Sequence, residues 1–85
     1  MGTYDKLLNT ILSGISDNNI NFLKLKNLLL KLGFNVRVKG DHFIFFKDEI
    51  AEIINIQPTK NNKAKSYQIK QIRNLILKYK LTLSI

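Results

Sequence analysis

The sequence predicts an α+β fold: a two-layer sandwich in which a three-stranded antiparallel sheet carries helices on one face. Three observations lead to it. The 85 residues, 45% of them hydrophobic, suffice for one small domain. Apolar residues recur at helical spacing near both ends of the chain, and between these segments they alternate with polar residues as in strands. The expected order is α-β-β-β-α, preceded by an extra N-terminal helix.

Two helices are predicted ahead of the strands. The first has apolar residues at helical spacing, and Gly14 is placed to end it: Tyr4, Leu7, Leu8, Ile11 and Leu12. Asn21 is the candidate N-cap of the second helix, with Ile20 able to pack onto Leu25. The stripe continues to Leu32, and Gly33 is the natural C-terminal stop.

Three strands are expected next. Residues 34–39 alternate apolar and polar side chains, Gly40-Asp41 is typical of a hairpin turn, and residues 42–47 form the second strand. After the turn "KDE", a third strand spans residues 51–57, where Pro58 closes it. The second strand has apolar groups on both faces. Phe43 and Phe45 are therefore expected either to be exposed for a partner or to be covered by the N-terminal extension.

The last helix follows the loop "TKNNKAK". Ser66 is its expected N-cap, and its inner stripe is Ile69, Ile72, Leu75, Ile76 and Tyr79. Lys70, Arg73 and Asn74 are expected on the opposite face. Lys63 and Lys65 stand directly before the helix, where backbone N–H groups and the helix dipole favour an anion. They either form a phosphate site or simply keep a polar loop in water.

Positive charge is concentrated in the second part of the chain. Residues 1–52 have seven basic and six acidic side chains, whereas residues 53–85 have seven basic and no acidic ones. Such a one-signed field attracts a polyanion and makes binding fall with salt. This favours nucleic acid or another acidic partner over a surface that is charged only for solubility.

Several classes of protein are disfavoured. Without cysteine there is no disulfide, thiolate nucleophile or cysteine-based metal site. The carboxylates Asp48, Glu49 and Glu52 surround a turn with no histidine or cysteine beside them, so neither a metal nor a small-molecule cofactor is expected. The start of the chain does not resemble a signal peptide, and no apolar stretch approaches about 20 residues, so we expect a cytoplasmic protein without membrane contact. The mixed charge of the two N-terminal helices disfavours a DNA-binding helix-turn-helix.

His42 is the only histidine. Taken alone it is more typical of a structural or neutral residue than of a catalytic one. The predicted α-β-β-β-α order is also that of double-stranded-RNA-binding domains, which contact phosphates and shape rather than bases. The order by itself is a weak guide to function.

Two segments, however, resemble one family. "LLLKLGFNVRVKGDHFIFFK" is similar to the core of HicA-type mRNA interferase toxins, in which a leucine-rich helix ends in Leu-Gly-Phe and a basic strand leads to Gly-Ser-His. "NKAKSYQIKQIRNLILKYKL" is similar to the closing segment of that family. The resemblance covers about residues 22–81. It implies a HicA-like domain with a double-stranded-RNA-binding-domain-like fold over residues 22–85, and a helical extension over residues 1–21.

The resemblance implies the toxin of a toxin-antitoxin pair, an endoribonuclease that cleaves mRNA and is neutralised by a HicB-type antitoxin. His42 matches the catalytic histidine. Asp41 replaces the usual serine and would repel a phosphate, which predicts reduced activity; Phe43 and Gln57 stand where some members have further histidines. The expected RNA-binding residues are Arg37, Lys39, Lys63, Lys65, Lys70 and Arg73.

A metal-independent mechanism is expected, in which His42 takes the proton of a 2′-OH and Lys39 or Arg37 stabilises the phosphorane. One histidine supplies one acid-base role at a time, so water or Tyr67 would have to carry the second proton. The alternative is a non-catalytic module that binds double-stranded RNA.

Overall fold

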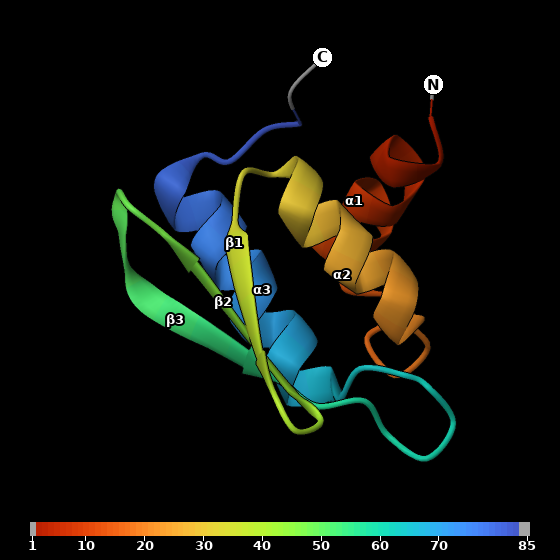
Figure 1. The fold of residues 1–85 in the computed structure, drawn as a ribbon. Coiled ribbons are helices and arrows are strands. Elements are labelled where there is room, and N and C mark those ends of the chain that lie inside the picture. The colour runs from red at the N-terminus through yellow and green to blue at the C-terminus, as the bar shows by residue number, and fades with distance from the viewer. Residues whose placement is uncertain (1, 84–85) are drawn as a thin grey trace.

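The computed structural model describes residues 2–83 and has the predicted order of elements (Figure 1). They are α1 (Thr3–Ser13), α2 (Phe22–Lys31), β1 (Asn35–Lys39), β2 (His42–Lys47), β3 (Ile50–Ile56) and α3 (Ser66–Tyr79). The predicted α+β class with an additional N-terminal helix is therefore confirmed. The outer ends of the predicted extension (1–21) and domain (22–85) lie outside the described residues.

Both ends of α2 follow the predicted signals. The Asn21 side chain accepts a hydrogen bond of 2.9 Å from the backbone N–H of Lys24. At the other end, Gly33 has a φ of 100° and donates to Leu30 O, while Phe34 N donates to Leu29 O. This pair of bonds is a Schellman motif, which needs a left-handed residue and so favours glycine. It turns the chain directly into β1.

The sheet is an antiparallel meander in the order β1-β2-β3. Lys39 pairs with His42 across the first turn, and Ile44 pairs with Arg37 on one side and Asn55 on the other. The register between β2 and β3 changes near the second turn: from Phe45 to Lys47 the partner moves from Ile54 to Ile50. Between these two pairs, one residue of β2 thus opposes three of β3, so β3 has two extra residues there.

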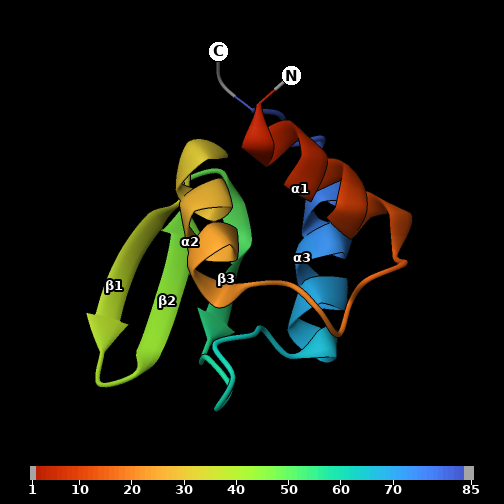
Figure 2. The same ribbon diagram turned by 90° about the vertical axis from the view of Figure 1, so that its right-hand side faces the viewer.

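The helices α2 and α3 cover one face of the sheet, and the other face is left open (Figures 1 and 2). The first helix, α1, packs on α2 and α3. The core between the layers includes Ile11 of α1, Leu25, Leu28 and Leu29 of α2, Phe45, Ile54 and Ile56 of the sheet, and Ile69 and Ile72 of α3, all with no exposed surface. No helix within residues 2–83 has the length and apolar character needed to cross a bilayer.

The side chains that β2 turns toward the core correct the expectation that Phe43 and Phe45 form an exposed partner site. Phe45 is completely buried, and Phe43 packs edge-on against Phe22 of α2 with 4.9 Å between ring centroids. Neither ring is therefore an exposed partner site, and Phe43 is covered by Phe22 at the start of α2, outside the predicted extension over residues 1–21. The open face instead has Ile44, Phe46 and Ile53. Side chains alternate along a strand, so burial of the odd-numbered residues of β2 places its even-numbered residues on the open face.

The start of α3 also differs from the prediction. Ser66 is the first helical residue, and Lys65 rather than Ser66 is the N-cap. The Gln68 side chain reaches back and accepts a bond of 3.1 Å from Lys65 N, half of a capping box. The preceding loop is fixed to the segment before α2, because Ala64 N donates to Ile20 O and Phe22 N to Asn62 O.

Two polar clusters connect α3 with the rest of the molecule. Arg73 forms a two-pronged ion pair with Asp17 at 2.9 and 3.1 Å and also donates to Ile11 O at the end of α1. Glu52 of β3 accepts hydrogen bonds from Lys78 (2.8 Å) and from the hydroxyl of Tyr79 (2.6 Å). These two bonds hold the pKa of Glu52 down to about 2.

The two neighbouring phenylalanines of β2 test this facing. Phe45→Ala should lower the free energy of unfolding by about 3–5 kcal/mol, because it leaves a cavity in the core. Phe46→Ala, on the open face, should cost about 1 kcal/mol or less. Urea unfolding of both variants measures the difference. Equal losses would contradict the assignment of the two faces.

The Glu52 cluster predicts a specific acid sensitivity. Because the folded-state pKa of Glu52 is below its ordinary value of 4.5, its contribution to stability is present above pH 4.5 and is lost as the pH falls toward about 2. Glu52→Gln should therefore lower the melting temperature at pH 6. Between pH 4.5 and pH 2 the melting temperature of this variant should decrease less than that of the unmodified protein. Glu49→Gln, in the exposed β2–β3 turn, is the matched control and should leave the profile unchanged. If the melting temperature of Glu52→Gln decreased below pH 4.5 as much as that of the unmodified protein, the proposed role of Glu52 in acid sensitivity would be contradicted.

Candidate functional site

His42 lies at the end of the sheet where β1 turns into β2. Gly40 has a φ of 63° in the two-residue loop, a backbone conformation that glycine adopts without strain. Because only two residues separate the strands, Lys39 and His42 pair directly with each other across β1 and β2. Since His42 is on the opposite face from Phe45, its ring points to the open face, with 48% of the side chain exposed.

A hydrogen bond to β3 orients the imidazole. Nδ1 of His42 lies 3.2 Å from Oδ1 of Asn55. An amide oxygen can only accept, so Nδ1 must donate, and in the neutral ring the lone pair is then on Nε2. This is the tautomer that a histidine needs in order to take a proton through Nε2.

Asp41 is adjacent to that nitrogen. Its Oδ2 accepts a hydrogen bond of 2.7 Å from Gln57 Nε2, and its Oδ1 lies 3.8 Å from His42 Nε2. Gln57 thereby holds the carboxylate beside the imidazole. A carboxylate at this distance attracts the protonated ring and repels an approaching phosphate. It therefore favours the imidazolium form of His42 but disfavours binding of the substrate phosphate.

His42 lines two shallow hollows. The first, of about 460 Å³, is bordered by Lys39, Gly40, Asp41, Ile44 and Asn55. The second, of about 250 Å³, lies between the sheet and the start of α3 and is bordered by Asn55, Gln57, Tyr67 and Gln68. The imidazole is thus accessible from the open face of the sheet and from the start of α3.

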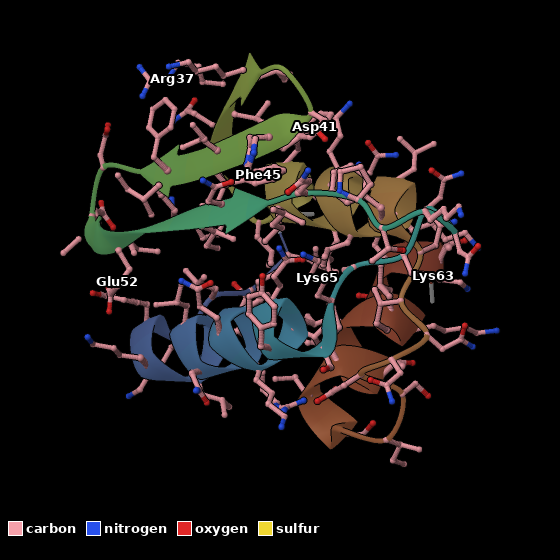
Figure 3. The ribbon with its side chains drawn as sticks, turned by 90° about the horizontal axis from the view of Figure 1, so that it is seen from below. Arg37, Asp41, Phe45, Glu52, Lys63 and Lys65 are labelled. Carbon is pink, nitrogen blue, oxygen red and sulfur yellow. The ribbon has the colours of Figure 1, made fainter. Side chains whose placement is uncertain are left out.

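Three of the predicted RNA-binding residues surround this region. Lys39 borders the first hollow. Arg37 is two residues earlier on the same face of β1, pointing away from the helices (Figure 3). Lys65 is the N-cap of α3, and its Nζ lies 5.9 Å from the centre of the Tyr67 ring beside the second hollow. In Figure 3, Lys65 and Asp41 lie toward the same end of the molecule, far from Glu52.

The other three are less directly placed. The Nζ of Lys63 donates to Asn19 Oδ1 at 2.7 Å, so this lysine helps to hold the N-terminal segment against the loop. Lys70 is exposed but faces Asp17, whose pKa it helps to lower.

Arg73 is largely engaged in contacts within the protein. Its side chain is only 18% exposed and its guanidinium is bound to Asp17 and to the end of α1, so it has a structural role, and its contact with RNA stays a prediction. The hydrogen bond and charge of Arg73 lower the pKa of the Asp17 carboxyl, and Asp17 in turn raises the pKa of Arg73. The helical pattern placed Arg73 away from the sheet, but it could not show that α1 and its connection cover that side.

Asn55 was not among the site residues predicted from the sequence. Its alternation with Ile54 and Ile56 does place it on the open face, which is the signal that could have found it. Its contact with His42, however, depends on the register of β2 and β3, which changes along the pair. Tyr67 was considered only as a proton carrier; the structure adds that its ring borders the second hollow.

The donors and acceptors gathered here suit acid-base chemistry on a phosphate ester: one oriented imidazole, one nearby carboxylate and flanking cations. Among residues 2–83, no group of three or more histidine, cysteine, aspartate or glutamate side chains is arranged to hold a metal ion. Comparisons of the chain with protein-family models, with curated proteins and with solved structures gave no match.

The Asn55 contact can be tested on the protein alone. Because the chain has one histidine, its ring nitrogens give a single set of signals in ¹⁵N NMR spectra. Neutral His42 should be protonated at Nδ1, and Asn55→Ala should shift it toward a mixture of both tautomers. Asn61→Ala, in the exposed loop before α3, is the control and should change neither signal. A neutral ring protonated mainly at Nε2 in the unmodified protein would contradict this hydrogen bond.

Proposed function

We propose that this chain is a HicA-type toxin, a cytoplasmic endoribonuclease that cleaves mRNA with His42 as its catalytic residue. The observation that carries the proposal is the orientation of that imidazole. It is exposed, its Nδ1 is bound to Asn55, and its residue lines two hollows, one bordered by Lys39 and the other by Tyr67, whose ring lies beside Lys65. The family resemblance of residues 22–81 supports the same reading.

In the proposed reaction, Nε2 of His42 takes the proton of a ribose 2′-OH, and the oxygen attacks the adjacent phosphorus. The bond to the 5′-oxygen of the next nucleotide breaks, and that oxygen takes a proton from water or from the hydroxyl of Tyr67. Lys39, across the strand from His42, stabilises the charge of the phosphorane. The products are a 2′,3′-cyclic phosphate, which can hydrolyse to a 3′-phosphate, and a 5′-hydroxyl end.

Asp41 has one favourable and one unfavourable effect on the proposed reaction. Its carboxylate, held by Gln57, stabilises the imidazolium that forms once Nε2 has taken the proton. The same charge disfavours the substrate phosphate at the mouth of the first hollow. The second effect acts on binding as well as on the reaction, so we propose an enzyme slower than one with serine at this position.

A HicB-type antitoxin is the proposed protein partner. Two features of the open face support it: the apolar side chains of Ile44, Phe46 and Ile53, and the basic residues Arg37 and Lys39 beside them. An acidic or apolar antitoxin segment on this face would cover His42 as well. The apolar part of this surface is the even-numbered side of β2, and not the Phe43 and Phe45 that the sequence suggested.

Replacement of His42 tests the proposal. His42→Ala should lower the rate of RNA cleavage by about 10²- to 10⁴-fold, the contribution typical of a positioned acid-base group. RNA affinity and melting temperature should stay nearly unchanged, because the side chain is half exposed. Cleavage should continue in EDTA and leave cyclic or 3′-phosphate ends. A variant that cleaves at the original rate would remove the imidazole from the mechanism, and RNA binding without cleavage by the unmodified protein would indicate the non-catalytic binding module.

The basic residues are the complementary control. Lys39→Ala and Lys65→Ala should each weaken RNA binding at low salt and reduce the magnitude of the salt slope by about 0.7 to 1, one phosphate contact each. Lys80→Ala, at the opposite end of α3, should leave the slope unchanged.

A further inference from the structure

We infer that the hollow between His42 and Tyr67 holds one unpaired nucleobase of the RNA, stacked on the Tyr67 ring. This inference rests on the proposed ribonuclease function and deepens it, because it specifies single-stranded RNA as the substrate.

The exposure of Tyr67 is the first observation. It is the second residue of α3, and 63% of its surface is accessible although it belongs to the aromatic class that proteins usually bury at least in part. The other large apolar residue exposed on this helix, Leu77, lies near its far end, away from the hollow. An aromatic ring on a basic surface beside a polar hollow is the arrangement by which proteins bind single-stranded nucleic acid.

The lining of the hollow is the second observation. Apart from Tyr67 and His42 it consists of three amide side chains, those of Asn55, Gln57 and Gln68. A nucleobase has an apolar face and an edge of hydrogen-bond donors and acceptors, so an aromatic ring next to amides complements both. Gln68 is buried, and both of its amide atoms are hydrogen-bonded within the protein. Hydrogen bonds engage Oδ1 of Asn55 and Nε2 of Gln57, which leaves Nδ2 of Asn55 and Oε1 of Gln57 to meet a base edge.

The size of the hollow and its cation agree with one nucleotide. Its volume of about 250 Å³ is below the roughly 300–1,000 Å³ of pockets that enclose drug-sized ligands, and fits a single planar base. Lys65 Nζ lies over one face of the Tyr67 ring, 5.9 Å from its centre, so the base would stack on the other face and the ammonium would remain near enough to contact the phosphate of that nucleotide. His42 borders the same hollow, so the ribose of that nucleotide would present its 2′-OH to the imidazole.

This geometry discriminates against duplex RNA. Within a duplex both faces of each base are covered by its neighbours, so Tyr67 can stack only on a base that is already splayed out. Stacking accepts any base, because all have a π-face, so the Tyr67 contact by itself confers a preference for single strands rather than for one sequence.

The test is a binding measurement with an RNA that cannot be cleaved. The probe is a fluorescein-labelled hexanucleotide with 2′-fluoro sugars, which lack the attacking hydroxyl, used as a single strand, with one abasic position at a time, and as a duplex. Tyr67→Ala should weaken single-strand binding by about 5- to 150-fold and duplex binding hardly at all. Tyr67→Phe should stay within about twofold. Leu77→Ala, equally exposed on the same helix, is the matched control and should have no effect.

The abasic probes locate the contact. At one position, loss of the base should weaken binding to the unmodified protein but not weaken it further in Tyr67→Ala. If Tyr67→Ala loses stability, Tyr67→Trp provides a second measurement. Its indole would be the sole tryptophan and should be quenched by the intact strand but not by the strand that is abasic at that position. Unchanged affinity in Tyr67→Ala, or equal losses for single strand and duplex, would overturn the inference.

The two proposals can fail separately. Binding that depends on Tyr67 in a protein that cleaves no RNA would leave the base site standing and remove the nuclease. Cleavage by a protein whose RNA affinity is indifferent to Tyr67 would do the reverse. No RNA binding at all would overturn both.

Discussion

Burial of Phe45 is the constraint on which the arrangement of the sheet depends. It is fully buried in the middle strand, in the core between the sheet and the helices. Because side chains alternate along a strand, the same contact sends His42, Ile44 and Phe46 to the open face. A slip of one residue would bring the imidazole into the core and the phenyl ring into water, so the apolar packing of β2 also determines the accessibility of its only histidine.

Most of the fold could be predicted because its signals are local. The N-cap at Asn21, the stop at Gly33 and the turn at Gly40 each depend on the conformational preference of one residue, and all three lie where the sequence places them. The N-terminus of α3 was wrong by one position for a physical reason. The Gln68 side chain caps Lys65, so Ser66 enters the helix.

The site was predictable in part. Alternation places His42, Lys39 and Asn55 on one face, and the two-residue change of register leaves that face unaltered. Which residue of β3 reaches His42 depends on where the register changes, and no local signal encodes that. The contacts of Arg73 could not be predicted either. The amphipathic pattern of α3 identifies the side of this helix that faces away from the sheet, but it does not show which part of that side α1 and Asp17 cover.

The connectivity of the sandwich has a consequence for synthesis on the ribosome. The covered face of the sheet is completed by α3, the last helix, and the hollow beside His42 draws Asn55 and Gln57 from the end of the sheet and Tyr67 and Gln68 from that helix. A nascent chain that has emerged only as far as β3 can pair the three strands and pack α2 on them, but the part of the apolar face that α3 covers remains exposed. We therefore expect the site to assemble as one of the final events of folding, so that an incomplete chain lacks the arrangement that the finished one presents.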